Sequence, residues 1–244
     1  MAKCGESSIS RIRNTSMAKG ANNSYMTFDH WQLCTTTKLQ FDFRTHLANG
    51  LLLYQDDGNG VAFLELKLVA GQLVMRLKVA EDKVLGFKIG ENLDNGEWHM
   101  VRIERFEDDI LLKMNSSLRK VALDLDTEDN DLLGASHQRS PLYVGGLPQL
   151  YTLMSGSFSL PSIFYEPRFS GSINNVLMGN CSNQMEAVEP VSTNGLILRP
   201  VEGCEETTPC LNDGRCLSSP EGFRCDCQYT FYHGSTCSLR KRLL

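Results

Sequence analysis

Short segments in which apolar and polar residues alternate dominate the chain between residues 27 and 200. In the clearest of them, Leu39, Phe41 and Phe43 alternate with polar neighbours, and the same pattern returns over residues 63–68, 73–79 and 101–104. Because successive side chains of a β-strand point to opposite faces of a sheet, this period of two predicts strands that bury one face.

Turn signals separate these segments, as at Asn49-Gly50, Asp57-Gly58 and Asn95-Gly96. Many short strands divided by such turns are typical of antiparallel sheets that pack on each other. The sequence therefore predicts an all-β fold, a β-sandwich or jelly roll.

The nine cysteines are unevenly distributed, because six of them crowd the C-terminal end of the 244 residues. These six are Cys204, Cys210, Cys216, Cys225, Cys227 and Cys237. Such density predicts a small module stapled by disulfides in an oxidising compartment, which excludes a typical cytosolic enzyme.

Charge and hydropathy narrow the function classes further. The formal net charge is −5, whereas a nucleic-acid partner requires a basic face for its phosphates. The sequence contains no apolar run of about 18 residues that would predict a membrane-spanning helix, and its start lacks the apolar stretch of a signal peptide. We therefore expect a fragment of a larger, membrane-anchored protein that acts outside the cell or at its surface.

Composition divides the chain into four parts. Residues 1–24 are polar and predict a flexible leader, and residues 25–200 form the sandwich. Residues 201–238 contain the cysteine module, and residues 239–244 are a tail.

The spacing of the six C-terminal cysteines is C-x5-C-x5-C-x8-C-x-C-x9-C, with a single residue between Cys225 and Cys227. This pattern resembles the EGF-like domain, whereas a zinc site normally pairs cysteines two or more residues apart. The resemblance implies the pairs Cys204 with Cys216, Cys210 with Cys225, and Cys227 with Cys237, one choice among the 15 that six cysteines allow. Calcium-binding members of that family carry acidic or amide residues ahead of the first cysteine. Here Pro200-Val201-Glu202-Gly203 and Ser218 stand at the relevant positions, so we expect a calcium-free spacer.

Motifs in the large domain resemble those of laminin G-like domains. They are a turn followed by Trp98-His99, the run from Gly50 to Tyr54, the run from Leu142 to Pro148, and the run from Phe169 to Ile173. A laminin G-like domain followed by an EGF-like domain resembles the repeating unit of the α-neurexin family, most closely its first laminin G-like (LNS) domain. Agrin, the laminins, slit and crumbs share both modules. The resemblance implies a concanavalin-type jelly roll and a role in cell–cell contact.

Laminin G-like domains often bind calcium at the rim of the sandwich. The resemblance implies that the main carboxylate corresponds here to Ala62, and that the further ligands correspond to the carbonyl of Val79 and to Gly179 or Asn180. Losing the charged ligand weakens the attraction for a divalent ion. The sequence therefore does not predict the usual calcium site, and a weak site near Asp56 and Asp57 stays open.

Four Asn-x-Ser/Thr sequons fit a secreted glycoprotein, at Asn14, Asn22, Asn115 and Asn180. Asn115 is the foremost candidate for glycosylation because it lies at a predicted hairpin tip, whereas the sequon of Asn180 contains Cys181. We also expect Cys34 and Cys181 to pair, since the first and last strands of a closed sandwich are often neighbours. Cys4 is then left over.

No constellation of residues points to catalysis. The five histidines are scattered, and no Gly-x-Ser-x-Gly elbow occurs. His99 belongs to a strand motif and predicts packing, and alternation sends Glu65 and Glu104 outward, so nothing marks them as a glycosidase pair. We expect no enzyme.

With catalysis not expected, a binding function remains. A β-sandwich holds its loops on a stiff scaffold, and such loops are common recognition surfaces. The expected partners are cell-surface or secreted proteins, in synaptic contact for the neurexin family. The alternative is a matrix or lectin-like module that binds heparan sulfate or another glycan, for which the basic clusters Arg119-Lys120 and Arg240-Lys241-Arg242 are small. A second open question concerns residues 154–167, whose aromatic side chains either form an exposed interface or fold back onto the sandwich.

Overall fold

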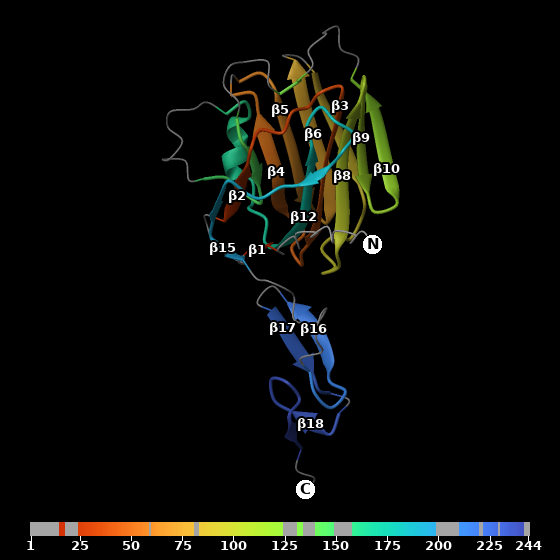
Figure 1. The fold of residues 1–244 in the computed structure, drawn as a ribbon, viewed down its shortest axis with the longest axis vertical. Coiled ribbons are helices and arrows are strands. Elements are labelled where there is room, and N and C mark those ends of the chain that lie inside the picture. The colour runs from red at the N-terminus through yellow and green to blue at the C-terminus, as the bar shows by residue number, and fades with distance from the viewer. Residues whose placement is uncertain are drawn as a thin grey trace, which may run out of the picture.

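Two antiparallel sheets make up most of the protein in the computed structural model, as the alternating pattern predicts (Figure 1). The structure describes residues 15–17, 24–58, 60–80, 83–123, 131–133, 140–148, 158–198, 210–219, 222–228 and 230–241. The prediction of an all-β sandwich is confirmed. Among the described residues, no helix is long and apolar enough to cross a membrane.

The first sheet, sheet A, has eight strands. Its order is β10 (Ser117–Ala122), β9 (Asp109–Met114), β8 (His99–Phe106), β3 (Thr36–Arg44), β12 (Gly171–Gly179), β1 (Thr15–Met17) and β15 (Leu196–Leu198), with β13 (Glu186–Ala187) also paired to β12. The second sheet, sheet B, has seven strands. Its order is β14 (Ser192–Asn194), β2 (Tyr25–Phe28), β11 (Leu142–Val144), β4 (Gly50–Asp56), β5 (Phe63–Val69), β6 (Gln72–Ala80) and β7 (Lys83–Ile89).

The main core lies between the two sheets and is built by the alternating residues. Leu39, Phe41 and Phe43 of β3 are at most 1% exposed, and they face Leu64 and Leu66 of β5 within one apolar cluster. Each such side chain removed from water contributes about 1.5–3 kcal/mol. The hydrophobic effect therefore fixes which face of each strand turns inward.

The two outer faces of the sandwich differ, because the chain covers one of them. The short 3-10 helix η2 (Pro161–Tyr165) and its flanking residues pack over the outer face of sheet B. A second apolar cluster lies there, formed by Leu51, Tyr54, Phe63, Tyr143, Leu147 and Ile163. The outer face of sheet A keeps its alternation: β3 and β9 present half-buried residues between buried ones.

Residues 15–17 differ from the expected flexible leader. They form β1, which pairs antiparallel with β12 on one side and with β15 on the other. The segment has no apolar periodicity, so its strand depends on backbone hydrogen bonds to neighbours that sequence patterning does not reveal. The rest of the leader and Cys4 lie outside the described residues, as do Asn14 and Asn22.

A disulfide joins Cys34, just before β3, to Cys181, just after β12. These two strands are antiparallel neighbours in sheet A, so the bond links the ends of adjacent strands. It closes a loop with a sequence separation of 147 residues. In the chain-entropy account, a loop of that length stabilises the fold by on the order of 5 kcal/mol.

The C-terminal region contains two small hairpins. The first pairs β16 (Arg215–Ser219) with β17 (Gly222–Asp226), and the second pairs β18 (Tyr232–His233) with β19 (Leu239–Arg240). Disulfides join Cys210 to Cys225 and Cys227 to Cys237. Cys204 lies outside the described residues, so its expected pairing with Cys216 stays a prediction. The arrangement is consistent with an EGF-like module.

Candidate interaction surfaces

Asp56 and Asp57, the candidate calcium ligands, bind the segment of residues 158–166 that packs over sheet B, called the covering segment below. The hydroxyl of Tyr54 and the backbone N–H of Ser159 donate to the same oxygen of Asp56, at 2.9 and 3.0 Å. The Ser159 hydroxyl donates to Asp57 at 2.7 Å. Burial, and then the neighbouring Asp56 charge, raise the pKa of Tyr54 above its ordinary value, so Tyr54 stays a donor. Asp56, Asp57, Tyr54 and Ser159 are called the clasp below.

Hydrogen bonds already engage the carboxylates of the clasp. The oxygens of Asp56 already accept hydrogen bonds from three donors, the third being the N–H of Gly58. A calcium ion would compete with these donors for the same oxygens. The expected carboxylate position, Ala62, is buried in the core, Val79 packs against the core, and the Asn180 oxygen accepts from the Gln32 N–H. In the described ranges, no three His, Cys, Asp or Glu residues are grouped to hold a metal.

The aromatic residues of the covering segment fold back onto the sandwich, which answers the open question for its described part. The ring of Phe158 lies 5.7 Å from that of Tyr54 and 5.0 Å from that of Phe164. Ile163 is 1% exposed, but Tyr165 is 90% exposed. The segment therefore hides most of its apolar surface and leaves one tyrosine in solvent.

Glu65 and Glu104 both point away from the core, as alternation predicts, but from different sheets. Glu65 lies on sheet B beneath the covering segment, with no exposed surface, and pairs with Arg76 and Lys67. Lys67 also pairs with Glu166 of the covering segment. Glu104 lies on the outer face of sheet A. Two carboxylates on opposite sides of a sandwich cannot flank one glycosidic bond.

His99 is a packing residue, as its strand motif predicts. Its Nε2 lies 3.0 Å from the Asn95 side-chain oxygen, its Nδ1 lies 3.2 Å from the Asn115 amide nitrogen, and its ring lies 5.4 Å from that of Phe43. Burial lowers the pKa of His99, and the charge of Glu97 opposes this only in part. The neutral ring therefore donates through Nε2 and accepts through Nδ1.

Asn115 lies at the turn between β9 and β10, as predicted, with φ of 50°. Its side-chain oxygen accepts from the N–H of Met100 at 2.9 Å, and its amide nitrogen contacts His99. The residue is exposed. Asn115 thus ties its turn to β8 while remaining accessible from solvent.

His30 and Asp131 form a carboxylate–imidazole pair, which sequence analysis did not single out. The His30 Nε2 lies 3.1 Å from Asp131, and its Nδ1 lies 2.9 Å from the carbonyl of Ser140. Burial raises the pKa of Asp131, but hydrogen bonds from His30 and from the N–H groups of Leu33 and Leu133 outweigh it and lower the pKa overall. The pair thereby links the segment before β3 to residues about a hundred positions later in the chain.

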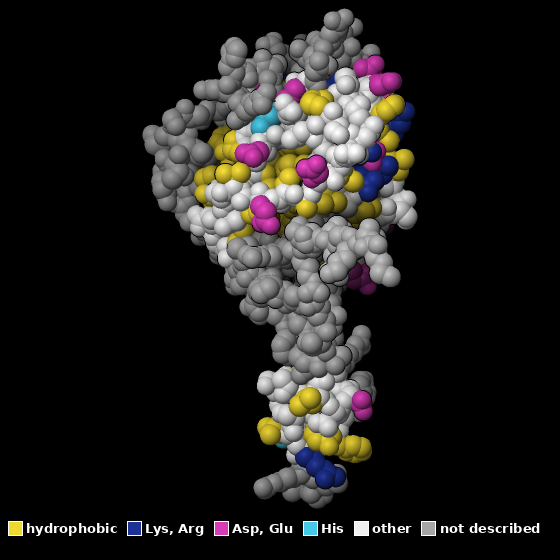
Figure 2. All heavy atoms as spheres, in the orientation of Figure 1, with side chains coloured by type: hydrophobic (Ala, Val, Ile, Leu, Met, Phe, Trp, Pro, Cys, Tyr) yellow, Lys and Arg dark blue, Asp and Glu magenta, His cyan; other side chains and the backbone are white. Residues whose placement is uncertain are grey.

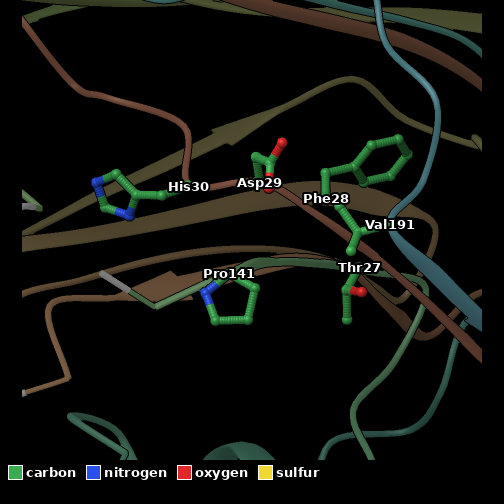
Figure 3. A pocket seen from close by; sticks show the side chains of 6 residues that line it. All are labelled: Thr27, Phe28, Asp29, His30, Pro141 and Val191. Atoms are coloured by element: carbon green, nitrogen blue, oxygen red, sulfur yellow. The ribbon is translucent and has the colours of Figure 1, made fainter. Parts of the chain in front are cut away.

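His30 also borders a pocket of about 360 Å³ beside β2 (Figure 3). Figure 3 shows its ring turned away from the other lining side chains, which include Thr27, Pro141 and Val191. Among the described residues that line the pocket, Asp29 is the one with a carboxylate. Nothing in this set resembles a nucleophile with an adjacent base.

The outer face of sheet A gathers cations that are far apart in the sequence. They come from four adjacent strands and are Lys38, Arg102, Lys113 and Lys120. Figure 2 shows Lys and Arg side chains on the side of the sandwich where Figure 1 labels β10. Alternation predicts that each points outward, but only the strand order brings them together. A pocket of about 350 Å³ lies among them.

Comparisons with known proteins agree with this architecture. Residues 43–180 match the family model described as Laminin G domain. The chain is similar to Neurexin 1 of Drosophila melanogaster, 30% identical over 91% of this chain and 13% of that protein, and to Neurexin-2 of Homo sapiens, 28% identical over 90% of this chain and 12% of that protein. It therefore spans only about an eighth of these relatives.

Solved structures show the same fold at low sequence identity. Domains LG4-5 of the mouse laminin alpha1 chain align over 88% of this chain and 50% of that chain, with 16% identity and a TM-score of 0.57. The LG1-3 region of the laminin alpha2 chain aligns over 82% of this chain and 36% of that chain, with 16% identity and a TM-score of 0.55. The predicted laminin G-like sandwich is thereby confirmed.

Proposed function

The chain belongs to the laminin G domain family, and from this premise we propose that it is a non-catalytic extracellular module that binds protein partners in cell–cell contact, including contact at synapses. The neurexin relatives and the disulfides support a place outside the cell or at its surface. In this proposal the C-terminal region is an EGF-like, calcium-free spacer within a larger anchored protein.

The contrast between the two outer faces carries the proposal. Residues 158–166 cover the part of sheet B formed by β4, β5 and β11, although Val84 of β7 stays 53% exposed. Sheet A leaves Phe106 and Leu118 about half exposed, at 53% and 50%, among charged side chains. Exposed apolar residues within a polar surround are typical of protein interaction sites. Strands also hold such a surface in fixed geometry.

A screen of the chain against an array of cell-surface ectodomains tests the proposal. We expect saturable binding to at least one ectodomain that survives physiological salt. Binding to none of them, with the chain shown to be folded by its thermal transition, contradicts the proposal.

The cations on sheet A favour one second candidate, a module that binds heparan sulfate or another anionic glycan. Such binding is mainly electrostatic and therefore falls steeply with salt. Retention on immobilised heparin beyond physiological ionic strength supports this candidate, and elution below that strength excludes it.

A further inference from the structure

One row of side chains crosses the outer face of sheet A. Lys38 on β3 lies opposite Glu104 on β8, which lies opposite Leu111 on β9, which in turn lies opposite Lys120 on β10. These four residues, called the cross-strand row, also line the pocket of about 350 Å³ together with Phe106. A lysine therefore stands at each end of an apolar and charged floor.

The charges around the cross-strand row leave an excess of cations. Glu104 is neutralised by Lys113 at 3.1 Å and by Arg102 at 3.3 Å, and Asp109 pairs with Lys120 at 2.7 Å. Four cations thus face two carboxylates. Within the described part of the chain, Lys38 forms no ion pair.

Asp42 and Arg44, further along β3, carry opposite charges and add no net charge to this excess. The chain as a whole carries a net charge of −5, so a local excess of positive charge is not a consequence of composition. It favours a ligand with negative groups.

The distance between the two lysines of the row determines how far apart the negative groups of the ligand must lie. Three strand spacings separate Lys38 from Lys120, which is about 14 Å at about 4.8 Å each. An extended peptide rises about 3.4 Å per residue, so carboxylates about four residues apart reach both lysines. The residue midway between them then lies over the apolar floor of Leu111 and Phe106, of which Phe106 is 53% exposed.

We propose that the cross-strand row binds an extended acidic segment of a partner protein, with one carboxylate over Lys38, another over Lys120, and an apolar side chain between them. This inference depends on the proposed function. A sulfated glycan fits less well, because it offers no apolar side chain to Phe106 and because Glu104 and Asp109 repel a dense polyanion.

Fluorescence anisotropy with a labelled peptide, Gly-Glu-Ser-Leu-Ser-Glu-Gly, tests the geometry. We expect saturable binding that weakens with salt, at least tenfold weaker binding when both Glu residues become Gln, and weaker binding when the two Glu residues are only two positions apart. Equal affinity for all three peptides overturns the proposal.

Variants of the chain test the residues. Lys38→Glu with Lys120→Glu should weaken peptide binding at least tenfold, and Lys38→Gln with Lys120→Gln should weaken it less. The matched control is Lys88→Glu, an exposed lysine of β7 in sheet B, which should leave binding unchanged. Thermal unfolding of every variant checks that the fold is retained. Unchanged binding by both double variants overturns the proposal.

Two further comparisons distinguish this site from a protein-binding site elsewhere on the chain and from a glycan-binding site. If the charge-reversed variant still binds the ectodomains captured by the wild-type chain, the proposed function stands and the cross-strand row is not its site. If heparin competes for the chain but the acidic peptide does not bind, the ligand is a glycan and the peptide proposal is wrong.

Discussion

The backbone N–H of Ser159 donates a hydrogen bond of 3.0 Å to the carboxylate of Asp56, across 103 residues of sequence. This bond, with those of Tyr54 and Asp57, fastens the covering segment to sheet B. The covering segment thereby hides part of the outer face of sheet B, over β4, β5 and β11.

Weakening the clasp should loosen the covering segment. Asp56→Asn replaces an acceptor oxygen with an N–H group that faces other donors, and we expect it to lower the free energy of unfolding by about 2 kcal/mol. Ser159→Ala should lower it by about 1 kcal/mol, because the backbone bond remains. Urea unfolding measures both effects, with the exposed Asp29→Asn as control. An Asp56→Asn protein as stable as wild type contradicts the role of the clasp.

Alkaline pH should destabilise the fold through buried tyrosines. Burial, and then the charge of Asp56, raise the pKa of Tyr143 to about 12. The unfolded chain ionises its tyrosines near pH 10, so stability is fully present below that pH and is lost as pH rises through about 12. Urea midpoints measured between pH 8 and 12 check this. In Tyr143→Phe, the loss between about pH 10 and 12 should be smaller.

Acidic pH should destabilise the fold through protonation of Asp131. Its pKa is lowered in the folded state, so its contribution is present above the unfolded value of about 3.9 and is lost as pH falls through the folded pKa. Asp131→Asn should therefore lower the free energy of unfolding at pH 7. It should also make that free energy depend less on pH in the acidic range. If the variant and the wild type lose stability in parallel from pH 6 to pH 2, the His30–Asp131 pair contributes nothing.

Two variants of the sequon at Asn115 distinguish a glycosylation site from the structural role of the Asn115 side chain. In protein secreted from animal cells, Ser117→Ala removes the sequon and leaves the Asn115 side chain in place, so we expect a loss of mass equal to one glycan with unchanged stability. Asn115→Gln should lose the same mass and also about 1 kcal/mol, because the bond to the Met100 N–H is lost. Masses of the wild type and both variants that differ only by the substituted residues show that Asn115 carries no glycan.

Alternation in the sequence is sufficient to predict the strands and their inner faces. Leu39 and Phe41 are buried, and Lys38 is turned outward, because a period of two leaves each side chain only two directions. The same rule sends Glu65 outward, yet it is fully buried. Its burial depends on residues about a hundred positions away, which local pattern does not encode.

The candidate sites are less predictable from the sequence than the strands are, because their contacts join residues that are far apart in the chain. Asp56 and Asp57 are visible in the sequence as adjacent carboxylates, but the donors from Tyr54 and Ser159 that engage them appear only in three dimensions. The cross-strand row depends on the strand order of sheet A. Position along the chain separates Lys38 from Lys120, whereas the pairing of β3, β8, β9 and β10 brings them onto one face.

The most direct test of the account is a lysine-acetylation footprint of the chain, measured by mass spectrometry with and without a captured ectodomain. The account predicts that Lys38, Lys113 and Lys120 lose reactivity in the complex while Lys88 on sheet B keeps it. Unchanged reactivity at Lys38 and Lys120, with protection at Lys88, would show that the partner binds sheet B and contradict the account.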